Sequence, residues 1–165
     1  MDASPDLIPA LLGVTSIHVF GAGLNAERTS HTAVPELRKR GWRVVPVHPR
    51  DAGACIDGVP IRDSPEPGTP LEVAVLFLAP ERARAQVRRL LMTPFETPPL
   101  VWFQPGAEDE IALGWLNDAG WPTVHADCIV LYSERHNLVR EPVDLPWYRQ
   151  VADEDGSQCS VWTAH

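Results

Sequence analysis

The sequence predicts an α/β fold: a Rossmann-like, doubly wound sheet of five mainly parallel strands with helices on both faces. Three observations predict it. Short apolar segments alternate with helical patterns along the chain. Residues 73–78 (Val-Ala-Val-Leu-Phe-Leu) are continuously apolar, as in a parallel strand that is buried on both faces. The first strand runs directly into a glycine-rich turn that opens a helix, over residues 17–26.

The helices and strands are expected in alternation. Pro5 and Pro80 suit the first turn of a helix, because proline lacks the N–H that is unpaired there. Gly41 and Gly120 suit helix ends, because glycine adopts the left-handed conformation that ends a helix. We expect helices at 4–13, 30–40, 80–92 and 107–119, and strands at 17–21, 42–47, 73–78, 100–103 and 123–125. Right-handed crossovers then bring the loops 21–30, 48–50, 79–80, 104–106 and 126–128 to the carboxyl ends of the strands, where such sheets bind ligands.

The length of 165 residues fits one domain with a sizeable core. We assign residues 1–139, including the N-terminal helix, to this Rossmann-like domain. Residues 140–165 are expected to form a C-terminal tail, and its aromatic residues Trp147, Tyr148 and Trp162 predict packing on the domain or on a partner subunit. A homodimer is compatible with this tail.

Composition excludes several classes of function. The formal net charge of −8 argues against general nucleic-acid binding, which needs basic patches. No apolar segment reaches the roughly 20 residues that cross a membrane, and the N-terminus has no basic segment typical of a signal peptide. The three cysteines are widely spaced and odd in number, which favours a reducing compartment. We therefore expect a cytoplasmic protein.

The glycine-rich turn predicts a phosphate site. Glycines at a strand end allow a tight turn and a close approach of the backbone to an anion, and the following helix presents its positive dipole end. We expect Gly21, Ala22, Gly23 and Asn25 to line a pyrophosphate loop; the alternative is a structural turn without a ligand. Its G-x-G-x-x-A pattern by itself is typical of dehydrogenases.

Two residues that follow the turn are further candidates. Arg28 could pair with a phosphate through two hydrogen bonds, or be a solvated surface arginine. Ser30 is predicted to cap the next helix rather than to contact the ligand directly, although it stays in the candidate set.

The end of the second strand indicates which nucleotide is bound. A protein that binds NAD carries an acid about 20 residues after the glycines, to hold the ribose hydroxyls. Here the strand ends in His48, Pro49 and Arg50, and Asp51 comes only after the turn. Arg50, with His48 beside it, could therefore neutralise the 3′-phosphate of CoA or the 2′-phosphate of NADP, while Pro49 fixes the turn. The alternative is an ordinary surface turn.

The ends of the fourth and fifth strands supply the other candidates. Gln104 could hydrogen-bond a ligand amide, and Gly106 could let the backbone approach the ligand or simply form a turn, whereas Trp102 is expected in the core. Cys128 could form a mixed disulfide with CoA if its pKa is lowered, or be a buried apolar residue. His125 lies near it, but neighbours in sequence are poor evidence for a catalytic triad. The histidines show no metal-ligand spacing.

Four segments together resemble a known family. Residues 21–30 resemble its G-x-S-x-x-x-x-R-x-S loop, with Gly23 in place of the usual serine. The other three resemble V-x-P-V-N-P, V-W-x-Q-x-G and D-R-C-I-M-V-E-H, at residues 44–49, 101–106 and 126–131. Over roughly residues 7–136 the chain thus resembles the small stand-alone CoA-binding domain family, similar to the CoA-binding domain of the succinyl-CoA synthetase α subunit. It lacks the family's Asp and Arg after the third strand, and has Ala126-Asp127 for D-R.

The resemblance implies a CoA-binding or acyl-CoA-binding module that is non-catalytic or regulatory. The net charge, the short apolar segments and the histidine spacing predict no role for nucleic acid, membrane or metal. The phosphates would lie on loop 21–25, the adenosine near His48–Arg50, and the pantetheine arm toward Gln104 and Cys128. An enzymatic activity is left open, and no catalytic residue is assigned. Two alternatives remain: a small NADP-binding oxidoreductase, which the glycine pattern and Arg50 fit, and a ligand-free interaction protein that retains the fold, which the missing Asp and Arg favour.

Overall fold

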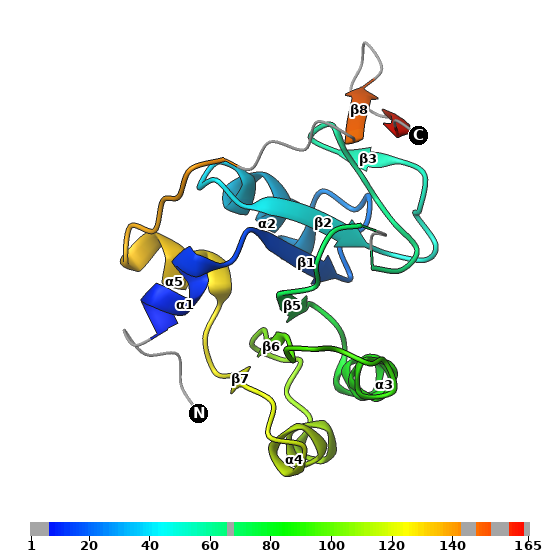
Figure 1. Ribbon diagram of the computed structural model, residues 1–165. Helices are drawn as coiled ribbons and strands as arrows, with labels where there is room; N and C mark the ends of the chain where they lie inside the picture. The colour runs from blue at the N-terminus through cyan, green and yellow to red at the C-terminus, as the bar shows by residue number, and fades with distance from the viewer. Residues whose placement is uncertain (1–6, 66–67, 143–147, 153–158, 164–165) are drawn as a thin grey trace.

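A five-stranded parallel sheet forms the centre of the protein. We describe it from a computed structural model, which covers residues 7–65, 68–142, 148–152 and 159–163. The strand order is β2-β1-β5-β6-β7, and each neighbouring pair is parallel (Figure 1). The strands are β1 (Ser16–Phe20), β2 (Arg43–Val47), β5 (Val73–Leu76), β6 (Leu100–Phe103) and β7 (Thr123–Val124). All five carboxyl ends therefore point to one edge of the sheet, as the sequence predicts.

Helices cover both faces of the sheet (Figure 1). One face packs against α1 (Leu7–Gly13), α2 (Thr29–Arg38) and α5 (Ile129–Arg135), and the other against α3 (Pro80–Leu91) and α4 (Glu110–Asp118). Each face has its own apolar cluster. In β5, Val73 and Val75 belong to one cluster, and Ala74 and Leu76 to the other. This alternation explains why the strand is apolar at every position.

Most predicted elements are confirmed, with ends that shift by up to three residues. The sequence reasoning missed α5 and two antiparallel hairpins. These are β3 (Cys55–Ile56) with β4 (Val59–Pro60), and β8 (Tyr148–Ala152) with β9 (Cys159–Thr163). The predicted cap of the first helix at Ser4 and Pro5 lies outside the described residues. Of the C-terminal tail, residues 140–142 are described in full, and Arg140 contacts the domain through its backbone N–H, which donates to the carbonyl oxygen of Arg40 at 2.8 Å. The side chains of residues 143–165, including Trp147, Tyr148 and Trp162, lie outside the described residues, and their packing stays a prediction. None of the helices in the described part of the chain is long and apolar enough to cross a membrane.

His18 lies in the middle of β1, where it is fully buried. Burial, together with the nearby positive charge of Arg43, lowers its pKa from 6.5 to about 3. The folded protein therefore keeps His18 neutral over a range of pH in which the unfolded chain is protonated.

This buried histidine predicts a loss of stability in acid. Between pH 6.5 and pH 3 only the unfolded state gains the proton, so the free energy of unfolding falls as the pH falls. The contribution of His18 is about 2 kcal/mol at pH 5 relative to pH 7. Urea unfolding at both pH values measures it, with His18→Gln as the comparison because glutamine does not titrate. An equal change in stability for both proteins would show that His18 is not the cause.

Candidate functional site

The glycine loop connects β1 to α2 at the carboxyl edge of the sheet. Gly21 has a φ of +98°, a conformation that side chains rarely adopt. Its N–H donates to the carbonyl oxygen of Val47 at 2.8 Å, and a Cβ at this position would come within 2.2 Å of the carbonyl oxygen of Phe77. Gly21 thus fits between the ends of β2 and β5, and only glycine meets the structural requirements of this position.

The remaining loop residues differ in their exposure. Ala22 and Gly23 are buried, whereas Leu24 and Asn25 are exposed. The side-chain oxygen of Asn25 accepts from the N–H of Glu27 at 3.1 Å, so this side chain shapes the loop. On the opposite side, Nδ1 of His31 lies 2.9 Å from the carbonyl oxygen of Gly23.

The amino end of α2 follows the loop directly. The helix begins at Thr29, and its N-cap residue is Arg28, whose side chain makes no capping hydrogen bond. Arg28 is exposed. The predicted cap at Ser30 is wrong: the helix starts one residue earlier than expected, so Ser30 is its second residue and is buried. The helix end thus lacks a side-chain cap and carries a cationic side chain, an arrangement suited to an anion.

Asp51 occupies the position next to the glycine loop. Its Oδ2 accepts from the N–H of Leu24 at 2.9 Å, and a Cβ on Gly23 would come within 2.4 Å of the same oxygen. The hydrogen bond from Leu24 is the main cause that lowers the pKa of Asp51, and a hydrogen bond from Arg50 lowers it further. From the sequence we expect cations at the end of the second strand, with Asp51 after the turn that follows. In the structure the turn brings an ionised carboxylate back to the loop.

The two candidate cations of the second strand surround Asp51. The backbone N–H of Asp51 donates to Nδ1 of His48 at 3.3 Å, and the His48 ring lies next to Gly23. Arg50 places Nε 3.3 Å from Oδ1 of Asp51, although its side chain is 76% exposed. Pro49 is exposed in the turn between them. The structure therefore brings the glycine loop, His48 and Arg50 together, as the sequence predicts, but around a carboxylate.

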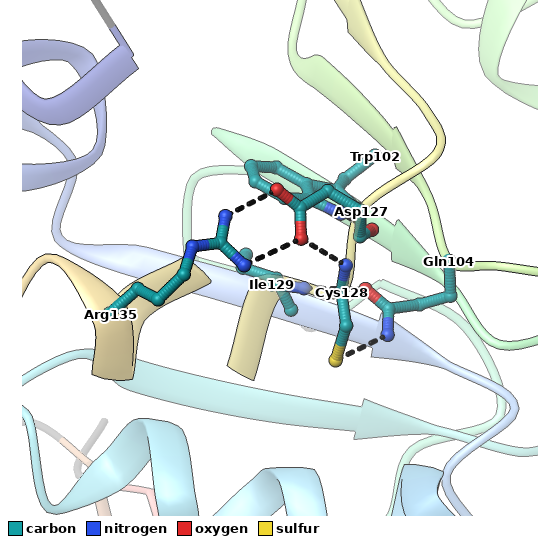
Figure 2. Close-up of polar contacts among 6 residues, drawn as sticks. All are labelled: Trp102, Gln104, Asp127, Cys128, Ile129 and Arg135. Carbon is teal, nitrogen blue, oxygen red and sulfur yellow. Dashed lines mark hydrogen bonds and ion pairs between the residues drawn. The ribbon is translucent and has the colours of Figure 1, made fainter. Parts of the chain in front are cut away.

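A second group of candidates lies where β6 and β7 end (Figure 2). Gln104 is buried, and both ends of its amide make a hydrogen bond: Nε2 donates to Sγ of Cys128 at 3.2 Å, and Oε1 accepts from the N–H of Ile129 at 2.9 Å. Cys128 is partly exposed. Gln104 thus contacts the thiol, and a ligand amide would use the remaining N–H or lone pair of this amide, or replace one of these hydrogen bonds. The mixed disulfide of Cys128 with CoA stays a prediction.

Asp127, next to Cys128, takes part in a local network of polar contacts. Asp127 accepts from the N–H of Cys128 at 2.8 Å, and its carboxylate pairs with Arg135 at 2.6 Å (Figure 2). Its carbonyl oxygen accepts from Nε1 of Trp102, which is fully buried as expected. Arg135 was missed in the sequence, because α5 itself was missed.

Glu108 connects the same two loops. Its Oε1 accepts from the N–H of Gly106 at 2.7 Å, and its Oε2 accepts from the N–H of Ala126 at 3.3 Å. Ala126 has a φ of +66°, which is unusual for a residue with a side chain. Gly106 is exposed, with no atom near its Cα that would oppose a side chain. The backbone N–H groups of Gly106 and Ala126 therefore donate to the carboxylate of Glu108, just as the N–H of Leu24 donates to that of Asp51.

The two groups of candidates offer different chemistry at their two ends. Among the residues that the structure describes, no group of three or more histidine, cysteine or acidic side chains could hold a metal ion. One end of the site offers loop N–H groups, a helix end and two arginines, and the other an amide and a thiol. An extended ligand with phosphates at one end matches this chemistry.

Comparison with known proteins assigns the family. The family model described as "CoA binding domain" matches residues 15–134, which include both groups of candidate residues. The chain belongs to the CoA-binding domain family. The resemblance in the four sequence segments is thereby confirmed.

Two solved structures are similar to the chain in fold. A Thermus thermophilus protein described as cell-free ID.343 shares 26% identity with the chain, with a TM-score of 0.69 over 81% of this chain and 98% of that one. A hypothetical protein from Pyrococcus horikoshii shares 24% identity and has a TM-score of 0.69, over 81% and 92% of the two chains. They share the fold of this CoA-binding domain. Among curated proteins, none matches the chain.

Proposed function

We propose that this CoA-binding domain binds CoA or an acyl-CoA and acts as a non-catalytic or regulatory module. The observation that carries the proposal is the family match across residues 15–134, combined with an α2 amino end that has no side-chain cap and bears Arg28. A phosphate at this place gains helix N–H groups and a cation together.

Each group of candidate residues would contact a different part of CoA. The pyrophosphate would contact the loop Gly21–Asn25 and Arg28. The exposed guanidinium of Arg50 would neutralise the 3′-phosphate, with His48 beside the ribose. The pantetheine arm would run along the sheet edge to Gln104 and Cys128, where amide donors and acceptors match its own amide groups.

Calorimetric titration with CoA, acetyl-CoA, NADP and NAD tests this function. We expect saturable binding of CoA or acetyl-CoA and a higher melting temperature in their presence, because a ligand that binds only the folded state stabilises it. Arg50→Ala should weaken the binding of CoA about tenfold, since one charge-assisted hydrogen bond to the 3′-phosphate is lost. The matched control is Arg82→Ala, an exposed arginine of α3.

The other outcomes separate the competing functions. Selective binding of NADP would overturn the CoA proposal and favour the small oxidoreductase. No response to any of the four ligands would favour an interaction protein that retains only the fold.

A cytoplasmic location and a homodimer, both expected from the sequence, remain part of the proposal. Light scattering coupled to size-exclusion chromatography measures the second. A mass of about one chain, 18.2 kDa, would contradict the homodimer.

A further inference from the structure

The glycine loop carries an anion supplied by the chain itself. Oδ2 of Asp51 lies 2.9 Å from the N–H of Leu24, which is the kind of backbone donor that binds a phosphate in such loops. The contact is long-range in sequence, since 27 residues separate the two groups. It is therefore made by the folding of the β2 turn onto the loop, and it is not a local turn motif.

The loop is shaped to accept this carboxylate. Gly23 lies directly beneath it, where even a methyl group would come within 2.4 Å of Oδ2 and 2.7 Å of the His48 ring. The side chain of Asp51 is only 14% exposed, so it lies against the loop instead of extending into solvent. Nε of Arg50 lies 3.3 Å from Oδ1, and Nδ1 of His48, which accepts from the backbone N–H of Asp51, lies 3.7 Å from Oδ2.

We propose that Asp51 is an internal competitor for the ligand phosphate, which determines the affinity and selectivity of the loop. The proposal rests on the proposed function in one respect: the ligand is a nucleotide whose phosphate approaches Leu24. Two anions cannot share one N–H donor at close range without strong repulsion. A phosphate therefore binds only when the Asp51 carboxylate moves away, and its binding free energy is reduced by the hydrogen bond that Asp51 gives up.

Displacement also releases a cation. When Asp51 leaves the loop, Arg50 loses its contact with Oδ1 and becomes available to the ligand. A ligand with several phosphate charges gains more from this exchange than a ligand with one, because it engages both the loop N–H and Arg50. Asp51 thus discriminates against weakly charged ligands.

The test compares Asp51→Asn and Asp51→Ala with the wild type. Titrations use two probes, inorganic pyrophosphate and CoA. Both variants should bind pyrophosphate and CoA at least about tenfold more tightly than the wild type. In the wild type, the phosphate must first displace the carboxylate of Asp51 from the N–H of Leu24, and the variants do not pay this cost. The control is Asp118→Asn, which removes the same charge from an exposed position near the end of α4, and its affinities should stay within about twofold of the wild type.

A second variant tests the geometry without altering charge. The methyl group that Gly23→Ala introduces should displace the Asp51 carboxylate from the N–H of Leu24. The Leu24 amide signal in ¹⁵N NMR spectra should then shift, and its hydrogen exchange should accelerate, as in Asp51→Ala. An unchanged Leu24 signal in Asp51→Ala would overturn the proposal without reference to any ligand.

The outcomes distinguish this inference from the proposed function. If the wild type binds CoA and the Asp51 variants bind it no better, Asp51 is part of the loop structure and the inference fails while the function stands. If neither the wild type nor the Asp51 variants bind CoA, but the variants bind pyrophosphate more tightly than the wild type does, the inference stands and the CoA function fails. Variants that fold but bind neither probe would overturn the inference.

Discussion

Replacing Gly21 with alanine is expected to destabilise the protein by about 3–5 kcal/mol. Two costs add at this position. The φ of +98° is unfavourable for any residue with a Cβ, and the added methyl group would lie 2.2 Å from the carbonyl oxygen of Phe77. That oxygen belongs to the backbone, so it cannot rotate away as a side chain would. Relief requires β1 and β5 to separate at the carboxyl edge, where the candidate site residues lie.

Gly106 offers a matched control for this prediction. Its φ of +94° is close to that of Gly21, but no atom lies within 4 Å of the position that a Cβ would take. Gly106→Ala should therefore cost only the conformational strain, about 1–2 kcal/mol. Urea unfolding of both variants measures the difference. Equal losses of stability would contradict the close contact between the loop and Phe77.

Replacing Asp109 with alanine is expected to cost about 2–3 kcal/mol of stability. Asp109 is the N-cap residue of α4, and its carboxylate accepts from the N–H of Ala112 at 2.9 Å. The same carboxylate forms two hydrogen bonds with Arg84 of α3, at 2.8 Å and 2.7 Å. Asp109 is buried, whereas the Arg84 side chain is 41% exposed, so solvent weakens the ionic part of the pair.

Two further variants separate the cap from the ion pair. Asp109→Asn keeps an oxygen for Ala112 and should lose only part of the stability. Glu110→Ala removes an exposed acid one residue later and should change stability by less than about 0.5 kcal/mol. The pairing with Arg84 lowers the pKa of Asp109, so its contribution is present above the unfolded pKa and is lost as the pH falls through the lower, folded value. A loss for Glu110→Ala as large as that for Asp109→Ala would contradict the assignment of the cap.

The parallel sheet was predictable because its strands carry strong local signals. Residues 73–76 are apolar at every position, and Pro80 marks the start of α3. The β3–β4 hairpin also had a signal that was missed: Asp57-Gly58, both with positive φ, joins two short apolar pairs. By contrast, α5 has only seven residues, with Ile129, Tyr132 and Ser133 buried, too short a pattern to separate from the preceding strand end.

The site was predictable as a set of loops but not in its electrostatics. The direction of the parallel strands brings loop 21–25, His48 and Arg50 to one edge of the sheet, independently of the contacts that their side chains make. The role of Asp51 depends on how the turn after β2 folds back, and Glu108 reaches the N–H of Ala126 across two loops. Such long-range contacts between side chain and backbone leave no periodic pattern in a sequence.

The central claim is that CoA binds at the carboxyl edge of this sheet. The most direct measurement is a ¹⁵N NMR titration of the full chain with CoA. We predict saturable changes at the amides of residues 21–25, with further changes near Arg50, Gln104 and Cys128. Absence of saturable changes at millimolar CoA, or changes confined to residues away from this edge, would contradict it.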